Sequence, residues 1–107
     1  MGYDAGCENW VGVRIDLDVV DQLKKKHPEA FADCPHDDWG VAELVESCGL
    51  ERGAHYHGPD QISYYVAGFC DGKIKDVLPH LKKLSTLLGQ KLSRKDVQKH
   101  HLVWISV

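Results

Sequence analysis

At 107 residues, with 43% hydrophobic and 27% charged residues, the chain has the length and composition of one soluble globular domain. No apolar stretch approaches the roughly 20 residues that a membrane-spanning helix needs, and the first ten residues lack the basic and apolar regions of a secretory signal. We therefore expect a cytoplasmic protein whose four cysteines stay reduced.

The charge is unevenly divided along the chain, although the formal net charge is only −3. Residues 1–60 hold 13 acidic and 5 basic side chains, a net charge of −8, whereas residues 61–107 hold 3 acidic and 8 basic side chains, a net charge of +5. Such an asymmetry bears on partners and association rather than on the fold.

The first half of the chain predicts a strand and then a helix. Residues 1–9 show no periodicity and are expected to form a flexible N-terminal arm of a single domain that spans residues 1–107. Residues 10–17 alternate apolar side chains in the manner of a strand. A helix is expected from Val19, with Asp18 as its cap. Pro28 either ends this helix or starts a short new turn that runs through Phe31.

A second helix and a weaker strand are expected before the middle of the chain. Asp37 or Asp38 is placed to cap this helix, and Gly49 is placed to end it in a left-handed conformation. Residues 51–57 are a strand candidate, and the Gly-Pro-Asp sequence at residues 58–60 predicts a turn after it.

The stretch from Gln61 to Cys70 has the clearest strand pattern, because β-branched and aromatic residues alternate along it. Apolar residues on both of its sides favour a central strand over an edge strand. Further along, Asp76 is placed to cap a third helix, whose stripe of leucines ends at Gly89. Residues 101–107 alternate again and predict a last strand.

This order of elements predicts an α+β fold, a ferredoxin-like βαββαβ two-layer sandwich. It would have a four-stranded antiparallel sheet, with its first helical segment split in two or three and the strand at residues 61–69 beside that at residues 10–17. A fold of this kind is used for many functions, so the function must be argued from particular residues.

The sheet face away from the helices is expected to be rich in aromatic rings. If the apolar residues of the first and last strands face the helices, the opposite face carries Trp10, Arg14, Tyr65, Phe69 and Trp104. Burying each ring contributes about 1.5–3 kcal/mol, so we expect something to cover them, a second copy of the chain first. Single-stranded RNA also stacks on such faces, but YYVAGFCD does not match the RNA-binding consensus, which makes direct nucleic-acid binding a further alternative only.

His55 and His57 have a spacing that metal sites use, because alternate residues of a strand project to one face. Cys34 and His36 are further ligand candidates, but nothing in the sequence brings the four together. We therefore expect no metal and no cofactor, and we assign no catalytic residue. A His/Cys metal-binding protein or small enzyme remains the alternative.

Acidic residues surround a tryptophan in the first half of the chain. The group consists of Asp33, Asp37, Asp38, Trp39, Glu43 and Glu46. Carboxylates around an aromatic anchor suit a surface that docks a basic protein. The leading hypothesis is a small non-catalytic protein-binding module, an inhibitor, immunity-type or regulatory protein, whose partner is a basic, nucleic-acid-processing protein.

Overall fold

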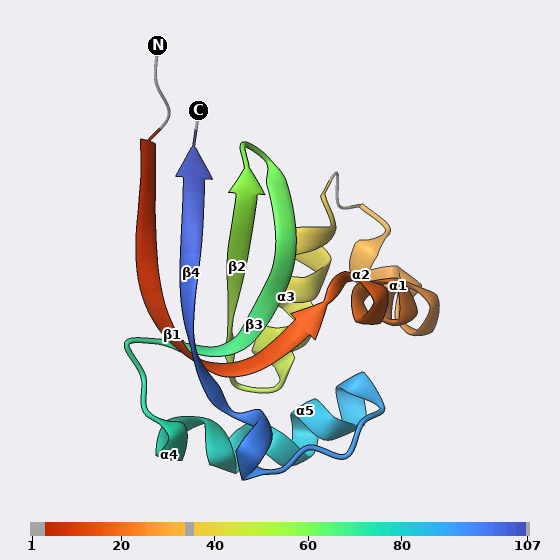
Figure 1. Cartoon of the computed structure of the whole chain (residues 1–107). Coiled ribbons are helices and arrows are strands. Elements are labelled where there is room, and N and C mark those ends of the chain that lie inside the picture. The colour runs from red at the N-terminus through yellow and green to blue at the C-terminus, as the bar shows by residue number, and fades with distance from the viewer. Residues whose placement is uncertain (1–3, 34–35, 107) are drawn as a thin grey trace.

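A four-stranded antiparallel sheet with the strand order β2-β3-β1-β4 forms the centre of the molecule (Figure 1). The computed structural model describes residues 4–33 and 36–106. The strands are β1 (Asp4–Asp16), β2 (Glu51–Gly58), β3 (Gln61–Cys70) and β4 (Gln98–Ser106). The predicted α+β class is confirmed, and so is the pairing of residues 61–69 with residues 10–17, because β3 and β1 are antiparallel neighbours at the centre of the sheet.

Helices pack against one face of this sheet (Figure 1). They are α1 (Leu17–Lys26), α2 (Pro28–Phe31), α3 (Asp37–Ser47), α4 (Ile74–Val77) and α5 (Leu81–Leu88), with 3-10 turns at Leu78–His80 and Arg94–Asp96. The segment between β1 and β2 is therefore divided, as the sequence predicts. Its second piece begins at Pro28, whose fixed φ and missing N–H suit the first turn of a helix.

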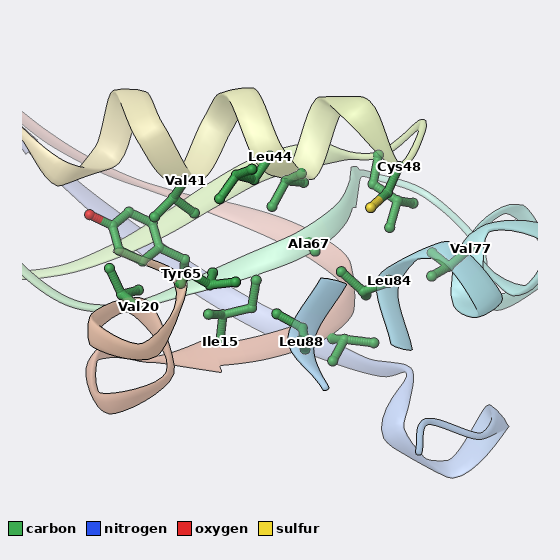
Figure 2. Packing of buried hydrophobic residues seen from close by; sticks show 14 of the residues in the cluster. Ile15, Val20, Val41, Leu44, Cys48, Tyr65, Ala67, Val77, Leu84 and Leu88 are labelled. Carbon is green, nitrogen blue, oxygen red and sulfur yellow. The ribbon is translucent and has the colours of Figure 1, made fainter. Parts of the chain in front are cut away.

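The main core lies between the sheet and the helices (Figure 2). Ile15 of β1, Val41 of α3 and Leu84 of α5 are each completely buried in it. The leucine stripe expected near residues 77–88 supplies Leu84 and Leu88 to this core. Two glycines end the helices that carry these side chains, Gly49 with φ +85° and Gly89 with φ +64°, in the left-handed region that the sequence analysis assigns to Gly49.

The helix starts differ from the predicted ones by one to three residues. The largest difference is at α4, whose N-cap is Lys73 and in which Asp76 is the third helical residue. The N-cap of α1 is Asp16 rather than Asp18, because β1 runs directly into the helix. The carboxylate of Asp16 does not cap α1, since it accepts a hydrogen bond from Nε of Arg14 at 2.6 Å. The N-cap of α3 is His36, which leaves Asp37 in the first turn, where a negative charge favours the helix dipole.

The prediction of a flexible arm at residues 1–9 is wrong for residues 4–9. These residues extend β1 and pair with β4, from Asp4 opposite Ser106 to Asn9 opposite His101. β4 begins at Gln98, three residues before the predicted start, and it supplies the hydrogen-bonding partner that the sequence of the arm does not reveal. Residues 1–3 lie outside the described part of the chain.

The predicted membership of the sheet face away from the helices is wrong for Tyr65 and Phe69. Tyr65 lies opposite Ile15, and Phe69 lies opposite Val11. Directly opposed residues of neighbouring strands project to the same face, so both rings face the helices together with the core residues of β1. Tyr65 is only 3% exposed there, and Phe69 packs against the same cluster.

The face away from the helices is covered by the chain itself. Trp10, Val66 and Leu102 form a second buried cluster on this face. The sheet curls so that β2 and β4, its two outer strands, approach each other over the cluster. A Cβ at Gly53 of β2 would lie 2.6 Å from Cδ1 of Leu102 and 2.9 Å from the ring of Trp10, which shows how closely β2 packs on these residues.

A hydrogen bond also joins the two outer strands. The backbone N–H of Val103 in β4 donates to Nδ1 of His55 in β2 at 3.1 Å.

Of the four aromatic rings expected on the sheet face away from the helices, only Trp104 is substantially exposed, at 40%. A dimer stays a prediction, but one exposed ring offers it much less apolar surface to bury than the four rings expected from the sequence.

Candidate functional site

The outer face of α3 presents a tryptophan between carboxylates. Trp39 is 58% exposed, the largest exposed fraction of any large hydrophobic side chain in the described residues. Glu43 and Glu46 follow it at intervals of four and three residues, which places all three on one side of a helix. Both glutamates are exposed, and the buried residues of α3 lie on its opposite side. We call Trp39, Glu43 and Glu46 the docking surface.

The segment that carries the docking surface is uniformly acidic. Residues 27–51 contain seven Asp and Glu residues and no Lys or Arg. Asp33, which belongs to the predicted acidic group, is exposed between α2 and α3. Because α2 and α3 have no cation of their own, their negative potential is balanced only from outside the segment.

Asp37 and Asp38 of the predicted acidic group form ion pairs with cations from other elements. Asp37 lies 3.1 Å from Nζ of Lys24, and Asp38 lies 3.7 Å from Nη1 of Arg52. The structure thus divides the six predicted residues: Asp37 and Asp38 point toward ion-pair partners at the start of α3, whereas the docking surface has no ion pair among the described residues. The sequence grouped them because they are near one another in the chain.

A pocket of about 540 Å³ opens beside the start of α3. Three carboxylates line it, from Asp37 and Asp38 of α3 and from Asp60 of the turn between β2 and β3. The remaining lining side chains are Leu17, His36, Tyr56, Ile62 and Tyr65. We call this cavity the α3 pocket. The sequence analysis missed it because its walls come from the start of α1, the start of α3 and the β2–β3 hairpin, which meet only in the fold.

Tyr65 is the most deeply buried side chain of the α3 pocket. Its ring packs between Val20 of α1 and Val41 of α3, and its hydroxyl points away from the leucines of α5 (Figure 2). Burial, and next the negative charge of Asp38, raise the pKa of this phenol to about 12, against the opposing effect of Arg52. The hydroxyl is therefore protonated and neutral near pH 7, and it has no hydrogen-bond partner within the described part of the chain.

The predicted metal candidates do not gather at one point. His55 accepts a hydrogen bond from Val103, whereas Nδ1 of His57 lies 2.6 Å from Oγ of Ser63. The pairing of β2 with β3 shifts register on both sides of Tyr56, which breaks the simple alternation that the prediction used. No group of three or more His, Cys, Asp or Glu side chains suited to a metal occurs in residues 4–33 and 36–106.

The other metal candidates stand apart from these histidines. His36 is exposed and lines the α3 pocket. Cys34 lies outside the described residues.

The sheet face away from the helices carries an aromatic stack that the sequence analysis did not single out. The guanidinium of Arg14 lies 3.9 Å from the ring centre of Tyr64, and the imidazole of His55 stacks on Tyr64 with centroids 5.0 Å apart. His100 lies beside the same ring at 6.4 Å. Alternation along β3 does place Tyr64 on the side opposite Tyr65, but the pairing of β2, β3 and β1 decides which residues surround it.

Comparison of the chain with protein-family models, with curated proteins and with solved structures finds no match. Among the described residues, no helix is both long enough and apolar enough to cross a lipid bilayer. The function must therefore be argued from the docking surface and the α3 pocket themselves.

Proposed function

We propose that this chain is a small, non-catalytic protein-binding module that engages a basic protein through the docking surface of α3. The observation that supports the proposal is a 58% exposed tryptophan on a segment, residues 27–51, that contains seven carboxylates and no Lys or Arg. An inhibitor, immunity-type or regulatory protein that blocks a nucleic-acid-processing enzyme would need such a surface.

The physical roles of the two kinds of side chain differ. Tryptophan is enriched among the residues whose truncation costs most binding energy, because burying its large ring removes much apolar surface from water. Carboxylates around it attract a positively charged partner over longer distances and raise the association rate more than the affinity. Glu43 and Glu46 are exposed and unpaired within the described residues, so they are free for this role.

We also assign the fold to the ferredoxin-like βαββαβ arrangement. The split helical segment and the central position of β1 and β3 support this assignment. We place the action of the protein in the cytoplasm, in keeping with the free state of Cys7, Cys48 and Cys70.

The RNA-binding alternative has less support. A stacking platform needs exposed rings, but Tyr65 is buried under the helices and Trp10 is covered by β2. The metal-binding alternative has His55 and His57 engaged with separate partners.

Quantitative affinity capture with two matched baits tests the proposal. Trp39 and Trp104 are the exposed tryptophans of the described chain, and they lie on different elements, α3 and β4. Trp39→Ala and Trp104→Ala therefore remove the same side chain from two different surfaces. A third bait, with Glu43→Gln and Glu46→Gln, removes two charges and keeps the tryptophan.

We expect a basic protein that is retained by the wild type and by Trp104→Ala but lost by Trp39→Ala. The Gln double variant should retain less of it, and the loss should grow as salt is added, since salt screens exposed charges. A protein that depends on Trp104 but not on Trp39, an acidic protein, or no protein at all would contradict the proposal.

A further inference from the structure

We propose that the α3 pocket receives an arginine side chain of the basic partner. This inference rests on the proposed docking of a basic protein, and it identifies the group that the partner inserts next to the docking surface. The pocket and the docking surface share α3, since Asp37 and Asp38 line the pocket and Trp39 is the next residue along the helix.

The charge of the pocket favours a cation. Three carboxylates line it, and none of its lining side chains within the described residues is a Lys or Arg. Lys24 and Arg52, from outside the lining, pair with Asp37 and Asp38, so the carboxylate open to a further cation is that of Asp60. The N-terminal end of α3, which alone would favour an anion, already has Asp37 and Asp38 in its own first turn. Asp60 is exposed, lines the pocket and has no ion-pair partner among the described residues.

An unpartnered hydroxyl in the pocket offers an acceptor to a ligand with N–H donors. Tyr65 is 97% buried, since only 3% of it is exposed, and its hydroxyl has no partner among the described residues. The hydroxyl oxygen itself is accessible from the pocket, since the fully buried side-chain atoms without a hydrogen bond in the described residues are Nε and Nη1 of Arg52. A cationic N–H group that enters the pocket would donate to this oxygen and to a neighbouring carboxylate at the same time.

The walls of the pocket favour a guanidinium over an ammonium group. Tyr56 and Tyr65 provide aromatic surfaces, and Leu17 and Ile62 provide aliphatic ones. A guanidinium is planar, weakly hydrated and able to stack on a ring while its edge binds a carboxylate, whereas an ammonium is a compact and strongly hydrated charge. The chain already uses this chemistry nearby, because the guanidinium of Arg52 lies 5.9 Å from the ring centre of Tyr65 and pairs with Asp38.

Binding of small arginine derivatives, followed by NMR shifts of backbone amides, tests the proposal without the partner. The probes are N-acetylarginine amide, its lysine equivalent and its neutral citrulline equivalent. We expect the arginine probe to shift amides around residues 36–38 and 60–65, the lysine probe to bind several-fold more weakly, and the citrulline probe not to bind. Equal binding of arginine and citrulline would overturn the claim of a cation site, and equal binding of arginine and lysine would overturn the claim of a guanidinium site.

Variants then locate the site. Tyr65→Phe removes only the hydroxyl and should weaken the arginine probe about threefold or more, because one acceptor of a guanidinium N–H is lost. Asp60→Asn should weaken it by up to about tenfold, as expected for a charge-assisted hydrogen bond, and Asn tolerates the positive φ of 57° at this position. Asp38→Asn is less suitable as the main variant, because it removes the ion-pair partner of Arg52. Unchanged binding in both of the first two variants would overturn the proposal.

The outcomes separate this inference from the proposed function. If the arginine probe leaves the pocket amides unshifted while Trp39→Ala abolishes capture of a basic partner, the pocket proposal fails and the docking surface stands. If the probe binds in the pocket while Trp39→Ala retains the partner, the docking surface fails and the pocket stands. Trp39→Ala is also the control for the probe, since Trp39 does not line the pocket and its removal should leave the affinity of the probe unchanged.

Discussion

Replacing Leu102 by alanine tests whether the sheet face away from the helices is covered by the chain itself. Leu102 is only 1% exposed, and it packs with Trp10 and Val66 under β2. A Cβ added at Gly53 of β2 would lie 2.6 Å from Cδ1 of Leu102, so β2 leaves little free space around the Leu102 side chain. A Leu→Ala change at such a site removes buried methyl groups and leaves a cavity.

The expected cost follows from both effects. Complete burial of a leucine side chain contributes about 1.5–3 kcal/mol by transfer from water, and measured Leu→Ala changes in well-packed cores cost about 2–5 kcal/mol once the cavity is included. Because β2 and β4 are outer strands that can move together slightly, we expect about 2–3 kcal/mol, the lower part of that range. For a domain of this size, such a loss lowers the melting temperature by roughly 10–20 °C.

Urea unfolding followed by far-ultraviolet circular dichroism gives the free energy of unfolding of each variant. Leu17→Ala is the matched control, because Leu17 is 45% exposed and alanine is at least as favourable in a helix. We expect the control to change stability by less than about 0.5 kcal/mol. Equal effects of the two changes on the free energy of unfolding would mean that Leu102 is not buried under β2. This result would contradict the close approach of β2 and β4 over the sheet face away from the helices.

Three other predictions concern pH, backbone approach and metal. Burial lowers the pKa of His100 below its ordinary value of 6.5, although its contact with the Gly12 carbonyl opposes this. The unfolded chain therefore binds a proton at this imidazole more readily than the folded chain, so the associated stability is present above about pH 6.5 and is lost as the pH falls. His100→Gln should flatten that part of the curve of stability against pH. An unchanged curve would contradict the lowered pKa of His100. Gly68→Ala should destabilise the protein by about 1–3 kcal/mol or prevent folding, because a Cβ there would overlap the carbonyl oxygen of Val11 in the neighbouring strand; a thermal midpoint equal to that of the wild type would refute this. A chelator should leave the melting temperature unchanged, and near-stoichiometric metal that is lost in His55→Ala would show the opposite.

Much of the local structure follows from the sequence, because it depends on neighbours in the chain. The alternation from Gln61 to Cys70 predicts β3 with its observed bounds, and Pro28 predicts the start of α2. Gly49 and Gly89 end helices because only glycine adopts the left-handed conformation without a steric penalty. Each of these features needs only a few adjacent residues.

The errors arise where distant segments meet. Alternation separates Tyr65 from Tyr64, but only the register with β1 decides that Tyr65 faces the helices. The strand at residues 4–9 has no apolar alternation of its own and forms because β4 pairs with it. The α3 pocket depends in the same way on segments that are far apart in the sequence, from Leu17 to Tyr65.

For the predicted acidic group, one part of the observed arrangement follows from the sequence and another part does not. Helical spacing alone places Trp39, Glu43 and Glu46 on one side of α3, so this part of the site follows from the sequence. The pairing of Asp37 with Lys24 and of Asp38 with Arg52 does not, because it depends on how α1 and β2 lie against α3.

The most direct test of the docking surface is the indole N–H signal of Trp39 in a nitrogen–proton correlation spectrum. The three tryptophans, Trp10, Trp39 and Trp104, give three such signals, and Trp→Phe variants assign them. On addition of the basic partner retained by the wild-type bait, we predict that the signal of Trp39 shifts or broadens while those of Trp10 and Trp104 stay in place. A shift of the Trp104 signal with an unchanged Trp39 signal would contradict the account.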